Sequence, residues 1–116
     1  MDKKQKQNQN YRIGAIGPYD IISLFRAYDI DCFDATNQHE VIETVERLKE
    51  SEEVRYAVIF VPESILKEMD RKAYTKLTEA TLPTITPIPL LKADDSASAE
   101  NIRRLAERAI GSDILK

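Results

Sequence analysis

Six consecutive apolar residues occupy positions 56–61 (YAVIFV), and Pro62 follows them at once. A strand with no polar positions has no side to turn to water, so both of its faces must be covered. Strands of this kind occur in parallel sheets that carry helices on both faces. Pro62 fits the first turn of a following helix, where its missing N–H removes no hydrogen bond. This one segment therefore predicts an α/β fold.

Three weaker strand segments accompany this central one. Residues 13–16 (IGAI) form a short apolar run that Gly17 and Pro18 end. Residues 30–34 (IDCFD) alternate polar and apolar side chains, and residues 82–89 (LPTITPIP) contain three prolines, so we expect both at sheet edges. The predicted fold is a four-stranded parallel sheet in the order 2-1-3-4, flanked by helices, which is typical of flavodoxin-like or Rossmann-like folds.

Helical spacing marks the segments between and after these strands. Asp20 is expected to cap the first helix, and Asn37 with Glu40 gives a capping-box signal for the second. The third helical stretch is expected to break near Asp70, and Gly111 ends the last helix. With 116 residues we expect one sheet domain over residues 11–93, a disordered polar extension over residues 1–10, and a C-terminal helix and tail over residues 94–116.

Charge and apolar runs restrict the class of partner. The net charge of −3 argues against nucleic acid or an anionic membrane as a direct partner, because both favour a concentrated positive face. No run of about 18 apolar residues is present, so we expect no direct membrane insertion. Cys32 is the single cysteine, and the polar N-terminus does not resemble a signal peptide. We therefore expect a cytoplasmic location.

The usual ligand site of such a sheet contains few residues that could do chemistry. Ligands bind at the carboxyl ends of the strands, where strands one and three meet. Residues 17–19 (GPY) and 61–63 (VPE) stand there, without the G-x-G-x-x-G spacing of a dinucleotide site and without the acceptor Asp of a phosphoryl-receiving domain. We therefore expect no catalytic residue and no cofactor. A stand-alone receiver-like or small-ligand-binding signalling domain remains the alternative.

The single cysteine and the single histidine also favour structural roles. Asp31 and Asp34 flank Cys32, whereas a nucleophilic thiolate needs a cationic neighbourhood. His39 falls in the first turn of the second helix, where we expect it to be exposed. One histidine and one cysteine do not form a zinc site, so we expect no metal.

The apolar stripe of the last helix allows two interpretations. Its members are Ile102, Leu105, Ala106, Ala109 and Ile110, and charged residues flank them. This stripe is core packing, or it docks on another chain.

Four segments carry a resemblance to a known family. Residues 105–114 (LAERAIGSDI) are similar to a closing motif L-x-x-x-A-I-G-V-D-I, and residues 82–89 match L-P-x-I-x-x-I-P. Residues 58–65 resemble I-x-I-T-E-x-I, with Pro62 at the usual Thr, and residues 13–17 followed by Phe25 and Arg26 match I-x-x-I-G…G-F-R, with Leu24 at the usual Gly. Taken together in chain order, the segments resemble the F subunit of prokaryotic V/A-type (vacuolar/archaeal-type) rotary ATPases.

The resemblance implies a non-catalytic role on the central stalk. F subunits bind the coiled coil of the D subunit, while ATP is hydrolysed on other chains of a complex peripheral to the membrane. The C-terminal helix of the family can leave the globular domain and modulate activity at the catalytic head. The resemblance thus implies partner contacts for the residues Phe25, Arg26, Ile102, Arg104, Leu105, Arg108, Ala109 and Ile110.

Overall fold

The computed structural model describes residues 11–89 and 99–111. Four parallel strands form one sheet in the order β2-β1-β3-β4, as predicted. The strands are β1 (Tyr11–Gly17), β2 (Asp31–Asp34), β3 (Arg55–Pro62) and β4 (Thr84–Ile88). The two segments expected at the edges, β2 and β4, lie there. The predictions for residues 1–10, 90–98 and 112–116 concern positions outside the described residues.

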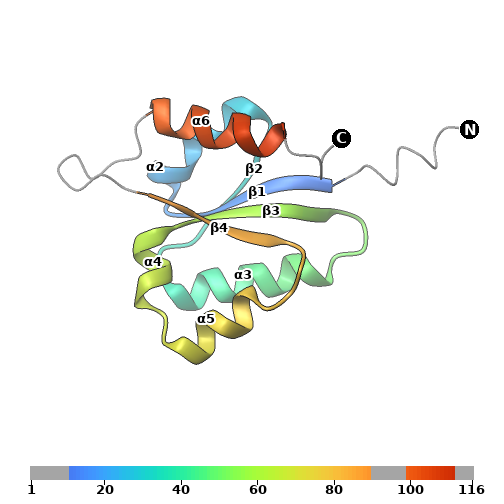
Figure 1. The fold of residues 1–116 in the computed structure, drawn as a ribbon, viewed down its shortest axis with the longest axis vertical. Helices are drawn as coiled ribbons and strands as arrows, with labels where there is room; N and C mark the ends of the chain where they lie inside the picture. Colours follow the sequence, from blue (N-terminus) through green and yellow to red (C-terminus); the bar gives the residue numbers. More distant parts are fainter. Residues whose placement is uncertain (1–10, 90–98, 112–116) are drawn as a thin grey trace, which may run out of the picture.

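Helices cover both faces of the sheet (Figure 1). On one face lie α2 (Tyr19–Ile22), the 3-10 helix η1 (Ser23–Tyr28) and α6 (Ala99–Ile110). On the other lie α3 (Gln38–Glu50), α4 (Glu63–Glu68) and α5 (Arg71–Thr78). Every residue of β3 after Arg55 is buried, so this strand separates two apolar layers. Ala57, Val58 and Phe60 face the α6 layer, whereas Tyr56, Ile59 and Val61 face the α3 layer.

Two of the predicted helix boundaries are confirmed. The side chain of Asn37 accepts a hydrogen bond from the Glu40 N–H at 2.9 Å, and the Glu40 carboxylate accepts one from the Thr36 N–H at 2.8 Å. These bonds satisfy amides that the first turn of α3 leaves unpaired. The predicted break in the third helical stretch also occurs, between α4 and α5. Asp70 caps the N-terminus of α5, because its side chain accepts a hydrogen bond from the Ala73 N–H at 2.8 Å.

The first helix differs from the prediction in two ways. Asp20 does not cap it, because the carbonyl of Pro18 accepts the Ile21 and Ile22 N–H groups and the helix begins at Tyr19. The expected single helix also tightens into the 3-10 helix η1 after four residues, and Asp29 ends it in the left-handed region at φ 62°. This tight segment places Phe25 on Phe60, with ring centroids 4.9 Å apart. Pro62, expected within the first helical turn, instead ends β3 and stands just before α4.

Gly17 stands where a side chain would collide with the adjacent strand. A Cβ atom at this position would lie 2.7 Å from Cδ of Pro62 and 3.3 Å from Cγ2 of Ile22. At Gly14, a Cβ atom would make ordinary contacts of 3.4 Å with the Tyr56 ring. The two glycines of β1 therefore have different tolerance for a methyl group.

We predict that Gly17→Ala lowers the free energy of unfolding by about 2 kcal/mol, because the rigid Pro62 ring has to move. Gly14→Ala is the matched control and should be neutral or slightly stabilising, since it fits and restricts the unfolded chain. Urea denaturation of both variants measures the difference. Equal midpoints for the two variants would show that the contact between Gly17 and Pro62 is not tight.

Candidate partner-binding surface

The usual ligand crevice between β1 and β3 is closed in this chain. Pro62 packs directly against Gly17, so close that the space of a single methyl group is already taken. In sheets of this topology a phosphate or cofactor needs the backbone of the first turn to be accessible at this point. The contact between Gly17 and Pro62 therefore fills the position where a phosphate would approach the backbone.

An amide of the same turn already has a partner. The Tyr19 N–H donates to Oδ1 of Asp34 at 3.0 Å, and the Gly17 carbonyl accepts from the Ala35 N–H beyond β2 at 2.9 Å. The Tyr19 N–H is one of the donors that an anion at this turn would need. Within residues 11–89 and 99–111, His, Cys, Asp and Glu side chains also form no group of three or more placed to hold a metal ion.

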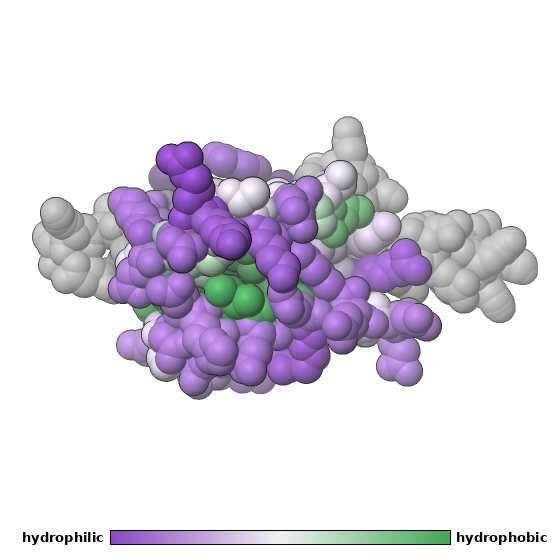
Figure 2. Space-filling view, turned by 90° about the horizontal axis from the view of Figure 1, so that it is seen from below, coloured by the Kyte–Doolittle hydropathy of each residue, from purple (hydrophilic) through white to green (hydrophobic). Residues whose placement is uncertain are grey.

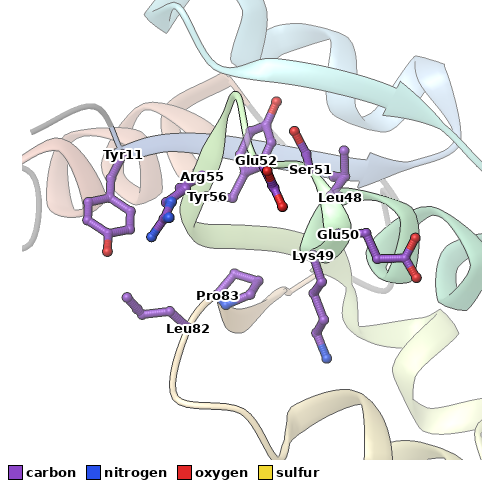
Figure 3. A pocket seen from close by; sticks show the side chains of 10 residues that line it. All are labelled: Tyr11, Leu48, Lys49, Glu50, Ser51, Glu52, Arg55, Tyr56, Leu82 and Pro83. Carbon is purple, nitrogen blue, oxygen red and sulfur yellow. The ribbon is translucent and has the colours of Figure 1, made fainter. Parts of the chain in front are cut away.

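A hollow of about 500 Å³ opens at the other end of the sheet, beside the amino ends of β1 and β3 (Figure 3). The C-terminal end of α3 and the segment before β4 also line it, with Lys49, Glu50, Glu52 and Arg55 as its charged side chains. In Figure 3 these four are spread around the hollow and do not converge on one point. Two cations and two carboxylates line the hollow, so it does not select a ligand by charge.

A polar network joins three strands on the α3 face of the sheet. The guanidinium of Arg12 on β1 donates two hydrogen bonds of 2.7 Å to the carboxylate of Asp31 on β2. The Tyr56 hydroxyl on β3 donates to the same carboxylate at 2.8 Å, and Arg12 also reaches the Asp29 carbonyl at 3.0 Å. This network fixes the open edge strand β2 to the centre of the sheet.

The network shifts the pKa values of Asp31 and Tyr56. The hydrogen bonds from Arg12 hold the pKa of Asp31 below its usual range, although burial opposes them and Tyr56 adds a further bond. Burial and the bond to Asp31 raise the pKa of the Tyr56 hydroxyl. Sequence analysis missed this network because its members lie 19 and 25 positions apart. A signal was available in the charge of Arg12, which is unusual in a strand so close to an apolar run.

Four of the proposed contact residues on α6 lie on its inner side or border it. Ile102 and Ala109 are buried in the layer that contains Phe25 and Phe60, and Leu105 packs against that layer while half-buried. Ile110 has 45% of its surface exposed at the end of the helix. In this conformation the stripe is therefore core packing along most of its length.

The charged contact residues of α6 face solvent. Arg104 is exposed and forms an ion pair with Glu100 at 3.7 Å, and Arg103 pairs with both Glu100 and Glu107 at 3.6 Å. Arg108 is also exposed. The outer face of α6 thus satisfies much of its own charge, and the sequence correctly places its two candidate arginines on the surface.

The last two candidates, Phe25 and Arg26, are neighbours in η1 with opposite environments. Phe25 is completely buried beneath α6, whereas Arg26 is exposed and donates to the Tyr19 hydroxyl at 2.6 Å. The structure therefore brings Phe25 together with Ile102 and Ala109, and it leaves Arg26, Arg104 and Arg108 on the surface. A partner could reach Phe25 only after α6 moves.

Cys32 and His39 occupy the structural positions expected from the sequence. The Cys32 thiol is half-buried and donates to the Ile22 carbonyl at 3.3 Å. Burial raises its pKa, and Asp31 adds to this effect while Arg26 opposes it, so burial is the main cause rather than the two flanking carboxylates. His39 is exposed in the first turn of α3, with Glu43 at 3.9 Å.

We predict that the stability conferred by Asp31 is lost in acid. A carboxylate whose folded pKa is depressed stabilises the fold above its unfolded pKa of about 4, and this contribution disappears as the pH falls through the folded value. Asp31→Asn should therefore destabilise the chain at pH 7, and its difference from the wild type should shrink as the pH falls from 4 toward 2. Denaturant midpoints measured between these pH values test this.

Asp29→Asn is the matched control, because asparagine also tolerates the left-handed backbone and the Asp29 carboxylate is highly exposed at 3.6 Å from Arg12. It should change the pH profile little. A wild-type profile that Asp31→Asn leaves unaltered would contradict the role of the network.

The chain matches known proteins along most of its length. The family model described as ATP synthase (F/14-kDa) subunit matches residues 13–106. The V-type ATP synthase F subunit of Clostridium perfringens is 30% identical over 104 residues, which cover 90% of this chain and 95% of that protein. The V-type ATP synthase F subunit of Fusobacterium nucleatum is 28% identical over 105 residues, 90% of this chain and 96% of that protein.

A solved structure supports the same fold. The crystal structure of the V-type ATP synthase F subunit of Archaeoglobus fulgidus superposes with a TM-score of 0.56 at 19% identity, covering 68% of this chain and 98% of that one. At this identity the likeness concerns the fold alone, and it agrees with the observed sheet order. The family model and the bacterial relatives settle the family. This chain belongs to the family of the ATP synthase (F/14-kDa) subunit, as an F subunit of the V-type ATP synthases.

Proposed function

We propose that this chain is a non-catalytic subunit of the central rotor stalk that binds the coiled coil of the D subunit. In this role it couples or regulates ATP hydrolysis or synthesis and ion transport, while the chemistry takes place on other chains. Family membership supports the assignment to the complex. The packed contact between Gly17 and Pro62 supports a scaffolding role for the sheet, because it fills the position where related folds bind ligands.

The regulatory part of this proposal rests on the small number of α6 side chains that are buried against the sheet domain. The buried side chains that hold it are one isoleucine, Ile102, and two alanines, Ala106 and Ala109, and the half-buried Leu105 packs beside them. On the helix side alone, burial of Ile102 and the two alanines contributes about 4 kcal/mol. A partner that binds the released helix with a Kd of about 1 μM, held at an effective concentration of about 1 mM inside the complex, supplies about 4 kcal/mol. An exchange of α6 between the sheet and a partner is therefore accessible to a partner that binds more tightly than this or that also covers Phe25.

Release of α6 would create a second contact surface on the sheet domain. The helix covers Phe25, whose ring lies on Phe60, so its departure would expose an aromatic side chain beside the already exposed Arg26. On the helix itself, Ile102, Leu105 and Ala109 would become available together with Ile110. We propose that these residues, with Arg104 and Arg108, contact the catalytic head subunits when α6 is extended.

We further propose that the protein acts at the cytoplasmic side of the membrane as a peripheral part of the complex. Among the described residues, no helix has both the length and the apolar character that crossing a bilayer requires. Attachment through the stalk would then be the means of association.

We predict a stable complex between the full chain and a D-type coiled-coil subunit. Mixed at micromolar concentrations, the two should co-elute in gel filtration ahead of either alone, and calorimetry should give a Kd of about 1 μM or lower. Calorimetry with nucleotides and phosphodonors tests the receiver-like alternative. Binding of such a ligand without any complex would favour that alternative and contradict the stalk assignment.

We also predict that truncation after Ser98 leaves the sheet folded and alters ATPase activity of the assembled complex. The loss of α6 removes the burial of its own side chains and exposes Phe25, but it leaves the α3 layer in place. Circular dichroism and activity assays measure the two effects. The surface variant Arg47→Glu on α3 serves as a control that should change neither. Complete unfolding of the truncated chain would show that α6 is permanent core.

A further inference from the structure

The cations of α5 form no ion pair among the described residues, a property that they share with Arg26, Arg47, Lys49, Arg55 and Arg108. On α6 the arginines 103 and 104 pair with glutamates of the same helix, and on the β2 edge Arg12 pairs with Asp31. The helix α5 (RKAYTKLT) carries Arg71, Lys72 and Lys76 and no acidic residue. Within the part of the chain that the structure describes, no carboxylate forms an ion pair with these three side chains. A chain of net charge −3 thus holds a local positive surface.

A groove of about 450 Å³ lies beside this helix. Its floor is apolar, with Leu66 and Met69 at the end of α4 and Pro87 on the edge strand β4. Tyr74 of α5, 45% exposed, forms part of its wall, and Arg71 stands at its rim. At the α4 side, Lys67 is already neutralised by Glu63 at 3.4 Å. Arg71 is therefore the cation of the groove that is left for a partner.

The groove belongs to the side of the molecule covered by α3 and α5, which Figure 2 shows from below. Apolar area lies there in the middle of a polar surround (Figure 2). Partly buried members of this layer include Ile42 of α3, Ala73 of α5 and Ile85 of β4. An apolar centre with a polar rim is the usual anatomy of a protein–protein interface.

The shape of the sheet edge excludes one mode of recognition. Pro87 lies in the middle of β4, the edge strand, and has no N–H to offer to an added strand. A partner that reads this region must therefore use side chains, as a helix does when it lies in a groove. Such a partner needs an apolar side chain for the floor and a carboxylate for Arg71.

We propose that the groove formed by Leu66, Met69, Arg71, Tyr74 and Pro87 is the docking site for an acidic, amphipathic helix of the coiled-coil stalk subunit. This inference rests on the proposed function and assigns it a surface. An apolar residue of the partner fills the groove beside Tyr74, and a carboxylate pairs with Arg71. Lys72 and Lys76, one turn apart on the adjacent flank of α5, attract the acidic helix over a longer range.

The test measures affinity for the D-type subunit by calorimetry with full-length variants. Arg71→Glu and Tyr74→Ala should each raise the Kd roughly tenfold or more, because the first reverses the charge that pairs with the partner's carboxylate and the second removes the aromatic wall of the groove. Lys72→Glu should weaken binding less and mainly reduce its dependence on salt. Arg47→Glu, an exposed helix position with the same charge change on α3, is the control and should bind as the wild type. Circular dichroism confirms that each variant is folded.

The outcomes separate this inference from the proposed function. Wild-type binding that Arg71→Glu and Tyr74→Ala leave unchanged overturns the groove assignment and leaves the stalk role intact. No binding by the wild type overturns both. Light scattering of the chain alone tests a second copy as the occupant: a dimer that Tyr74→Ala dissociates overturns the proposal in favour of self-association.

Discussion

The side chains of β3 are buried on both faces of the sheet, and each face therefore needs its own cover of helices. The two covers are unequal. On one side α3, α4 and α5 enclose a layer with Ile16, Ile59 and Val61 at its centre. On the other side α2 and η1 are short, and α6 covers the part of the sheet that they leave uncovered. Because β3 has to be buried on this face as well, α6 is part of the hydrophobic core.

This asymmetry gives α6 two properties at once. Ile102 fills a position that the sheet cannot leave open without exposing Phe25, so the docked state is well defined. The alanines beside it contribute little area, so the docked state is not deep. A helix of this kind suits regulation, because a partner of moderate affinity can compete for it. Its paired outer charges keep it compatible with water while it is docked.

The parts of this fold that local patterns determine could be predicted from the sequence. The apolar run of β3, the cap at Asn37 and the prolines of β4 each act within a few residues, and the strand order follows from them. The contacts that depend on distant residues could not. The network of Arg12, Asp31 and Tyr56 joins three strands whose residues lie far apart in the sequence. On the candidate surface, the arginines of α6 were correctly placed outside, and the helical spacing of the apolar residues around Phe25 favoured its burial. Its stack on Phe60 involves a distant strand and could not be predicted from this segment alone.

The charged side chains of α6 and α5 are arranged differently. On α6 the spacing of Glu100, Arg103, Arg104 and Glu107 allows i,i+3 and i,i+4 pairs, which satisfy the charges within the helix. On α5 the cations 71, 72 and 76 have no acidic residue at these spacings inside the helix, so their field extends into solvent. Pro62 closes the crevice where sheets of this type bind small ligands, so recognition by this chain falls to its helical surfaces. The proposed groove beside Arg71 needs no rearrangement of the docked chain before a partner binds, whereas Phe25 becomes accessible only after α6 moves.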